Sequence, residues 1–213
     1  MNPQESTLYN YAQLLASCTR ARLTGTRGAS EIYSLQVLDC LPSLESLPDS
    51  GKVIDVGSGG GLPGIVWAVY RPALNITLLD SVVKKCEAVR GIVEALGLGN
   101  VRVVCARSEE FARGNREAFD LAGARALASA GVCAELLSPL VKVGGRVITF
   151  KGERVHEEIS EVEDKWGLLG LGRPSLKFYG GESKCLVTWE KVRKCPAKFP
   201  RREGLAGTKH FWE

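Results

Sequence analysis

The sequence predicts an α/β fold in which a mostly parallel sheet is covered by helices on both faces. Three observations lead to this fold class. Apolar strand-like runs alternate with helical runs from Lys52 onward, a glycine-rich stretch follows the first of these runs, and 45% of the 213 residues are hydrophobic. A chain of this length can bury one full core. Strands that alternate with helices pair in parallel, because each helix returns the chain across the sheet.

Two helices are expected before the sheet. Apolar residues recur at helical spacing over residues 7–18 and 30–41. Thr7 and Ser30 are the expected N-caps, because their side chains can accept from the free amides of a first turn. We therefore expect residues 1–48 to form an N-terminal helical segment packed on the core.

The core is expected over residues 49–192. Its predicted strands are 53–57, 75–80, 101–107, 119–125, 144–152 and 184–192. Its predicted helices are 62–70, 81–97, 128–140 and 153–167. In a sheet of this kind, ligands bind beyond the carboxyl ends of the strands. The glycine-rich stretch after the first strand falls at that edge.

The stretch VIDVGSGGGLPGIVWAV brings backbone close to a ligand, since glycine has no Cβ to block the approach. A phosphate-binding loop for ATP would need Gly-Lys-Ser/Thr, and no lysine follows these glycines. A dinucleotide site stays open, because Gly59, Gly61 and Gly64 fit its glycine spacing and Asp80 ends the next strand.

Acidic residues at successive strand ends favour a different ligand. Asp55 would repel a pyrophosphate but attract a ligand with a positive amino group. Asp80 could accept both hydroxyls of a ribose, and Glu109, beside Ser108, could accept from an adenine amino group. A Lys-Val-Gly-Gly turn then leads the chain back into the sheet. Together these features predict a Rossmann-like methyltransferase that binds S-adenosylmethionine.

Two motifs that the sequence lacks reduce the number of possible methyl-acceptor atoms. No Asn/Asp-Pro-Pro-aromatic motif for exocyclic amines is present, and no cysteine follows a proline at the fourth strand end, where a C5 nucleophile would lie. Guanine N7 has a free in-plane lone pair, so no general base is required. Arg125, which ends the fourth strand, is expected to orient the cofactor or the base.

The positive charge of the chain is concentrated at its C-terminal end. The net charge is +4, whereas residues 191–213 alone carry +5 and also hold Phe199, Phe211 and Trp212. Residues 6–30 contain no acidic residue. Basic clusters with aromatic side chains suit an RNA backbone with stackable bases. We expect residues 193–213 to form a basic tail; a frayed, solvated tail is the alternative. The predicted phosphate contacts are Arg20, Arg22, Arg27, Lys84, Lys85, Lys198, Arg201 and Arg202.

The remaining composition argues against several other classes. The seven cysteines include no CxxC or metal-ligand spacing, which favours a reduced, cytoplasmic protein without a metal or a disulfide. No apolar run reaches membrane-spanning length, and the polar start MNPQESTLYN is unlike a signal peptide. We expect a monomer that makes no membrane contact.

At the level of motifs, the chain resembles the bacterial RsmG (GidB) family of small-subunit ribosomal RNA methyltransferases. The matching stretches are RLTGTRGASEIYSLQVLDCL, VIDVGSGGGLPGI, TLLDSVVKKCEAVR, ARSEEFA, ARALAS, KVGGRVITFKG and KFPRREGLAGTK. The resemblance implies a seven-stranded sheet with an antiparallel last strand. It also implies methyl transfer from S-adenosylmethionine, with S-adenosylhomocysteine as product, to guanine N7 of 16S rRNA near the decoding site, in naked RNA or in the small ribosomal subunit. The expected cofactor-binding residues are Asp55, Gly57, Gly59, Gly61, Leu62, Asp80, Ser81, Ser108, Glu109 and Arg125.

The chain departs from the family pattern at a few positions. Gln36 and Cys40 stand where members usually have histidine and serine, and Ala124 replaces a serine before Arg125. Ser183-Lys184-Cys185 replaces a usual Glu-Arg-His. These changes bear on RNA binding rather than on the cofactor. Two other functions stay open: an NAD-dependent oxidoreductase, and a non-catalytic RNA-binding assembly factor.

Overall fold

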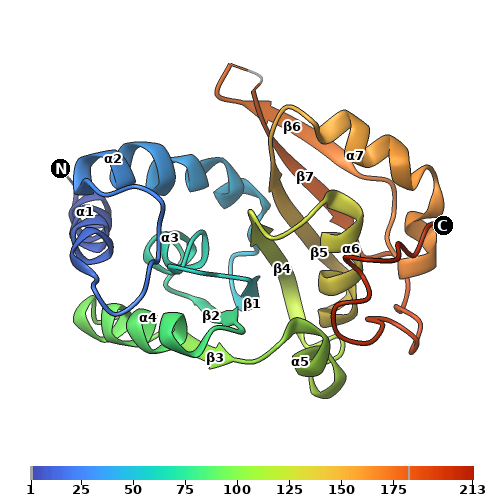
Figure 1. Ribbon diagram of the computed structural model, residues 1–213, viewed down its shortest axis with the longest axis horizontal. Coiled ribbons are helices and arrows are strands. Elements are labelled where there is room, and N and C mark those ends of the chain that lie inside the picture. Colours follow the sequence, from blue (N-terminus) through green and yellow to red (C-terminus); the bar gives the residue numbers. More distant parts are fainter. Residues whose placement is uncertain (1, 182) are drawn as a thin grey trace. The chain divides into compact units, whose positions relative to one another are not determined.

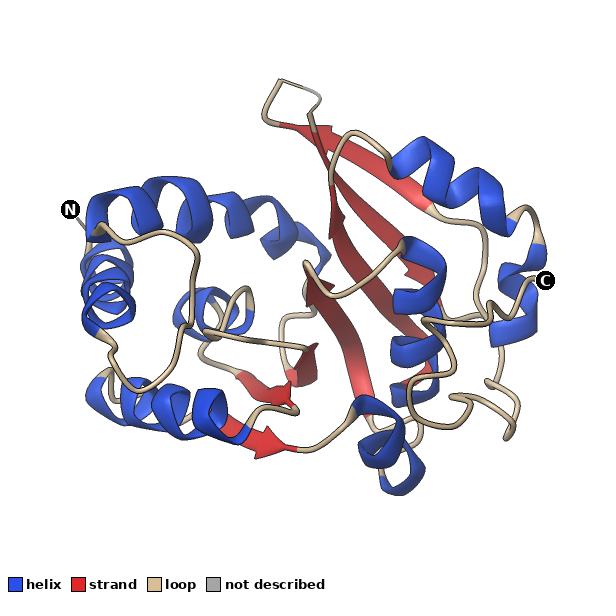
Figure 2. Cartoon of the chain, in the orientation of Figure 1, coloured by secondary structure: helices blue, strands red, loops and turns tan. Residues whose placement is uncertain are grey.

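The computed structural model describes residues 2–181 and 183–213. It contains two compact units, Met1–Ala106 and Arg107–Glu213 (Figure 1). The strands are β1 (Gly51–Val56), β2 (Leu74–Asp80), β3 (Val101–Cys105), β4 (Phe119–Arg125), β5 (Val141–Lys151), β6 (Ser175–Tyr179) and β7 (Lys184–Glu190). Their order in the sheet is β3-β2-β1-β4-β5-β7-β6, in which the first three belong to the N-terminal unit (Figure 2).

The sheet is mostly parallel, and β7 runs antiparallel to both β5 and β6. The predicted seven-stranded sheet with an antiparallel last strand is therefore confirmed. The six strand ranges predicted from the sequence do not include β6. It lies at the end of the strand order and none of its side chains is buried, because its sequence SLKFY lacks the apolar run of a buried strand.

The N-terminal unit places helices beside three parallel strands. Its helical segments are α1 (Pro3–Ser17), α2 (Ala29–Ile32), the π-helix η1 (Tyr33–Val37), the 3₁₀-helix η2 (Leu38–Ser46), α3 (Gly64–Tyr70) and α4 (Val83–Ala95). Helix α1 contacts α3 and α4, and these two contact β2. In the strand register, Asp55 and Val56 of β1 pair with Leu78 and Leu79, and Asp80 of β2 pairs with Cys105. These strand ends share one edge, which the glycine loop follows.

The helix starts expected near the N-terminus are wrong. Asn2 caps α1: its side-chain Oδ1 accepts from the Glu5 amide at 2.8 Å, and the Glu5 carboxylate accepts from the Asn2 amide at 2.9 Å. This reciprocal pair satisfies two free amides, so the helix begins before Thr7. Gly28, not Ser30, precedes α2. The helical path then continues through η1 and η2, which carries Pro42 inside it.

The C-terminal unit has a largely apolar helix at its centre. Its helical segments are α5 (Ser108–Gly114), which was not expected, α6 (Ala130–Leu137), η3 (Ser138–Leu140), α7 (Val155–Val162) and η4 (Lys165–Leu169). All residues of α6 are buried, and the helix contacts β4, β5, α5 and α7. The helix expected over 153–167 is interrupted at Glu163, whose φ of 53° lies in the left-handed region.

The last twenty residues are folded onto the C-terminal unit. Phe199 and Trp212 are only 3% and 7% exposed, and the Trp212 ring lies against Gly131 of α6. The Arg116 guanidinium donates to the carbonyl oxygens of Cys195 and Phe199. The alternative of a frayed, solvated tail is therefore wrong for these residues, because aromatic burial holds the segment in place.

We predict opposite effects for alanine at two helical glycines. A Cβ at Gly131 would lie 2.2 Å from Cζ3 of Trp212, whereas a Cβ at Gly91 in α4 meets nothing within 4 Å. Gly131→Ala should lower the free energy of unfolding by about 1–3 kcal/mol through overpacking. Gly91→Ala should raise it by about 0.5–1 kcal/mol through helix propensity. Urea unfolding measures both, and equal effects would contradict the packing described.

Candidate active site

The glycine loop after β1 is fastened by a buried carboxylate. The Asp55 side chain is fully buried at the end of β1, and its Oδ2 accepts from the Gly64 amide at 2.9 Å. A Cβ at Gly64 would lie 2.2 Å from Cδ2 of Leu78 and 3.1 Å from the same Asp55 oxygen. Only glycine fits there. The loop returns to the sheet at this point, and α3 begins directly over the end of β1.

A second carboxylate holds the middle of the same loop. Oδ2 of Asp80 accepts from the Gly59 amide, and Oδ1 accepts from the Val82 amide, both at 2.9 Å. The amides of Gly57 and Ser58 donate to the Leu79 carbonyl at 2.8 and 3.0 Å. Each carboxylate oxygen has two lone pairs. Asp80 can therefore hold the loop and still accept from the two hydroxyls of a ribose.

The loop conformation also suits a close ligand. Gly57, Gly59 and Gly61 have φ values of 71°, 56° and 102°, which L side chains rarely adopt. Without side chains, their backbone can touch a bound molecule directly. Leu62 and Ser81 are two further residues that the sequence analysis expects to bind the cofactor. Leu62 follows these glycines and is half-buried, and Ser81 follows Asp80 and is exposed. The residues of the N-terminal unit thus fit the amino-acid and ribose parts of S-adenosylmethionine.

Two buried side chains support this edge from behind. The Tyr11 hydroxyl of α1 donates to the Gly60 carbonyl at 2.8 Å. The Cys86 thiol donates to the Asp80 carbonyl at 3.3 Å, and burial raises the pKa of Cys86 to about 12. The thiol therefore stays a neutral donor near pH 7. Helix α1 thus holds the glycine loop directly, and α4 holds the end of β2 that carries Asp80.

The C-terminal unit holds the residues expected to meet the adenine. Ser108 and Glu109 begin α5, and the Ser108 hydroxyl donates to the Leu136 carbonyl at 3.4 Å. Oε1 of Glu109 accepts from the Gly204 amide at 3.0 Å, and Arg107 forms an exposed 2.8 Å ion pair with Glu203. The C-terminal segment thus reaches Glu109. The sequence predicted that Glu109 lies at a strand end, but it did not predict the contact of Glu109 with the C-terminal segment.

Arg125 occupies the last position of β4 and is half-buried. The next residue, Ala126, has a φ of 53°, an unusual conformation for a residue with a Cβ. The chain therefore turns sharply directly after Arg125, as is common beside functional sites. The expectation that Arg125 orients the cofactor or the base stays a prediction.

Most of the predicted phosphate contacts are exposed. This holds for Arg20, Arg22, Arg27, Lys84, Lys198 and Arg202, while Lys85 is half-buried. Arg201 differs, because its guanidinium forms two hydrogen bonds of 2.7 Å with Glu135, a side chain 1% exposed within α6. These bonds raise the pKa of Arg201 and compensate its charge. Its geometry favours a structural role, in which it anchors the C-terminal segment to α6.

Glu135, the buried partner of Arg201, was not predicted from the sequence. It is the one charged residue within the apolar helix stretch ASAGVCAELLSPL. A buried carboxylate needs a partner, so its presence there was a signal that a basic residue returns to this helix. Which of the many basic residues returns could not be inferred from the sequence.

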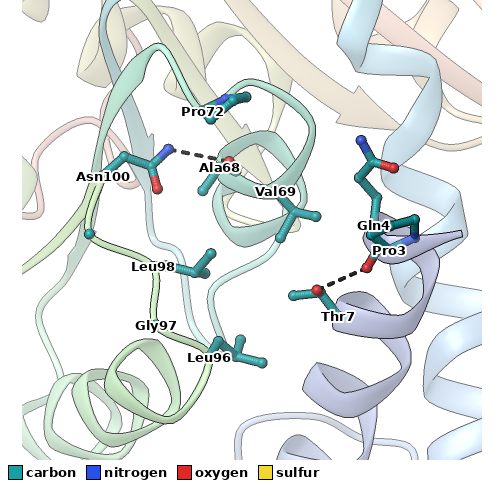
Figure 3. Close-up of a pocket in the computed structure, with 11 residues that line it drawn as sticks. Pro3, Gln4, Thr7, Ala68, Val69, Pro72, Leu96, Gly97, Leu98 and Asn100 are labelled. Carbon is teal, nitrogen blue, oxygen red and sulfur yellow. Dashed lines mark hydrogen bonds between the residues drawn. The ribbon is translucent and has the colours of Figure 1, made fainter.

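A second pocket in the N-terminal unit lies away from the glycine loop (Figure 3). Its volume is about 490 Å³, and it is lined by Pro3, Gln4, Thr7, Ala68, Val69, Pro72, Leu96, Gly97, Leu98, Gly99 and Asn100. The Asn100 amide donates to the carbonyls of Ala68 and Leu74, and the Thr7 hydroxyl donates to Pro3. The lining carries no charge, and these polar groups are already paired within the protein.

Within residues 2–181 and 183–213, no helix is long and apolar enough to cross a membrane. The same residues contain no group of three or more His, Cys, Asp or Glu side chains placed to hold a metal ion.

Comparison with known proteins gives concordant matches. The family model GidB, described as rRNA small subunit methyltransferase G, matches residues 4–187. A protein named ribosomal RNA small subunit methyltransferase G from Rubrobacter xylanophilus is 40% identical over 213 residues, covering 95% of this chain and 82% of its own. The protein of that name from Alkaliphilus metalliredigens is 35% identical, covering 97% of this chain and 90% of its own.

Solved structures resemble this one in fold. MtNAS in complex with S-adenosylmethionine aligns with a TM-score of 0.59 at 18% identity, covering 90% of this chain and 73% of its own. A 16S rRNA (adenine(1408)-N(1))-methyltransferase from Catenulisporales acidiphilia aligns with a TM-score of 0.54 at 15% identity, covering 74% and 92%. The predicted Rossmann-like methyltransferase fold is confirmed.

We predict that Asp80→Asn destabilises the protein. An amide in place of the carboxylate must turn its NH₂ group toward the amide of either Gly59 or Val82, so one partly buried backbone donor loses its acceptor. The free energy of unfolding should fall by about 1–3 kcal/mol. Asp49→Asn, at an exposed position, is the control and should stay within about 0.5 kcal/mol of wild type. Urea unfolding decides, and equal values for the two variants would contradict the role given to Asp80.

We also predict that two adjacent arginines differ sharply. Arg201→Ala leaves the buried Glu135 carboxylate without its partner and should cost about 3–5 kcal/mol of stability. Arg202→Ala removes an exposed side chain and should change stability by less than about 0.5 kcal/mol. Thermal and urea unfolding of both variants test the anchor. A stable Arg201→Ala protein would show that the C-terminal segment does not depend on it.

Proposed function

The chain belongs to the family of rRNA small subunit methyltransferase G, and on that premise we propose that it transfers a methyl group from S-adenosylmethionine to N7 of a specific guanine in 16S rRNA. The observation that carries the proposal is the glycine loop fastened by Asp55 and Asp80 in a chain of this family. S-adenosylhomocysteine is the other product.

The proposed cofactor contacts divide by chemical group. Asp80 accepts from the ribose hydroxyls, and the backbone of Gly57, Gly59 and Gly61 faces the amino-acid part. Glu109 accepts from the adenine amino group with the oxygen lone pairs that the Gly204 amide leaves available. Supporting this division, the buried Asp55 favours a ligand with a positive amino group over a pyrophosphate.

The proposed reaction needs no proton to be removed. The N7 lone pair attacks the methyl carbon of the sulfonium, the carbon–sulfur bond breaks, and its electron pair stays on sulfur. The base becomes cationic while the sulfonium becomes a neutral thioether, so charge moves but no proton does. The protein then acts by alignment and by exclusion of water. Arg125 would orient the cofactor or the guanine from the end of β4.

The proposed partner is 16S rRNA, alone or within the small ribosomal subunit, and the proposed location is the cytoplasm. The exposed cations Arg20, Lys84, Lys198 and Arg202 would neutralise phosphates, and we propose a monomer as the active form. Arg201 is left out of this set because Glu135 already compensates its charge.

Transfer of radiolabelled methyl from S-adenosylmethionine tests the proposal. The acceptors are small ribosomal subunits from a strain without the modification and, in parallel, their deproteinised RNA. Reduction and aniline treatment then cut the RNA at N7-methylguanine. We expect label at a single aniline-sensitive site for wild type, and a strong loss of label for Asp80→Ala, because its ribose contact is removed.

The other outcomes decide between the alternatives. Label that resists aniline would place the methyl group on another atom. RNA binding without any label would favour a non-catalytic assembly factor. Thermal stabilisation by NADH, with none by S-adenosylhomocysteine, would favour an oxidoreductase.

A further inference from the structure

The segment that joins α1 to α2 forms a positively charged pocket. Residues from Leu15 to Arg27 line a volume of about 320 Å³, into which Arg22 and Arg27 contribute their charges. Within the described part of the chain, neither arginine forms an ion pair with an acidic side chain. No acidic residue lines the pocket, and none occurs between residues 6 and 30. Two uncompensated guanidinium groups beside one cavity favour an anionic ligand.

Gln36 of η1 arranges hydroxyl donors in the same pocket. Its side-chain amide donates to the hydroxyl oxygens of Thr24 and Thr26 at 2.6 and 2.7 Å. The Thr24 oxygen also accepts from the Thr26 amide at 3.1 Å. A hydroxyl that already accepts from a neighbour still has a hydrogen to donate. The two threonines are therefore set as donors, which an anion needs and a cation does not.

The pocket adjoins the glycine loop. Leu15 and Leu23 line it, and the same two residues lie nearest to the position that a Cβ at Gly60 would take. A Cβ at Gly60 would lie 3.0 Å from the Leu23 carbonyl oxygen and 3.1 Å from Cδ2 of Leu15. Leu15 and Leu23 therefore contact both the pocket and the glycine loop. An anion bound here would therefore lie next to the loop that is proposed to face the cofactor.

We propose that this pocket binds a backbone phosphate of the RNA next to the guanosine that accepts the methyl group. The inference rests on the proposed function and specifies where its substrate is held. The carboxylate of S-adenosylmethionine is the competing anion. That cofactor carries a sulfonium and an ammonium against one carboxylate, so its net charge of about +1 is repelled by two arginines, whereas a polyanion is attracted. Gln36 acts as a positioning residue that keeps both threonine hydroxyls turned toward the phosphate.

The test compares RNA binding with cofactor binding in the same variants. Fluorescence anisotropy with labelled, deproteinised 16S rRNA fragments is measured over a range of salt, and calorimetry measures the affinity for S-adenosylhomocysteine. The double variant Arg22→Ala/Arg27→Ala should lower the slope of log affinity against log salt by about 0.7, since the one phosphate contact of the pocket is lost. Its affinity for S-adenosylhomocysteine should equal that of wild type.

Gln36→Leu separates geometry from charge. It removes no charge, so the salt slope should stay at the wild-type value while RNA affinity falls by about tenfold through misdirected hydroxyls. Arg113→Ala, at an exposed arginine of α5, is the matched control for loss of one charge. It should leave the RNA affinity near the wild-type value. Melting temperatures equal to wild type establish that the variants are folded.

Two results would overturn the proposal. Weaker S-adenosylhomocysteine binding with unchanged RNA binding would assign the pocket to the cofactor carboxylate. An unchanged salt slope in the double arginine variant would show that the pocket holds no phosphate. Methyl transfer is not needed for either comparison. A wild-type protein that binds RNA but transfers no methyl group would refute the proposed function and leave the binding comparison to decide the pocket.

Discussion

The site depends on two strand-end carboxylates that bind backbone amides of one loop. Asp55 accepts from Gly64 where the loop enters α3, and Asp80 accepts from Gly59 in its middle. Because these bonds fix the loop at two points, its glycines can keep positive φ values without being held by side chains of their own. The same constraint leaves lone pairs on Asp80 for a ligand. The carboxylate oxygens of Asp80 therefore hold the loop and are also the atoms proposed to accept from the ligand.

The C-terminal segment shows how charge count and charge role differ. Six residues of the segment 193–213 are basic, yet Arg201 faces inward to Glu135, while Lys198 and Arg202 stay exposed. An intact buried ion pair need not add much to stability. Removing one of its partners is strongly destabilising, since the remaining charge is then buried and uncompensated. The anchor therefore holds the exposed cations in fixed places, and the tail becomes a surface of the C-terminal unit.

Gln36, one of the departures from the family pattern, has defined contacts in the N-terminal unit. The family resemblance predicts a histidine at this position, where Gln36 donates to Thr24 and Thr26 with one NH₂ group. A glutamine amide stays neutral and keeps both donors at every pH, whereas a histidine titrates near neutrality. The contacts of Gln36 with the two hydroxyls therefore do not depend on the protonation of its own side chain.

The sequence alone determined the strands β1 to β5 and β7, because the spacing of apolar residues along the chain differs between strands and helices. It also determined the glycine loop and its acidic neighbours. It did not determine β6, the start of α1, or the short helix α5, whose residues carry little apolar periodicity. Only the tertiary structure decided that Arg201 meets Glu135, that Gly204 reaches Glu109, and that Leu23 packs on Gly60. These pairs lie up to 95 residues apart. Their partners are chosen by the folded path of the chain, because charge or size at one position fits many others equally well.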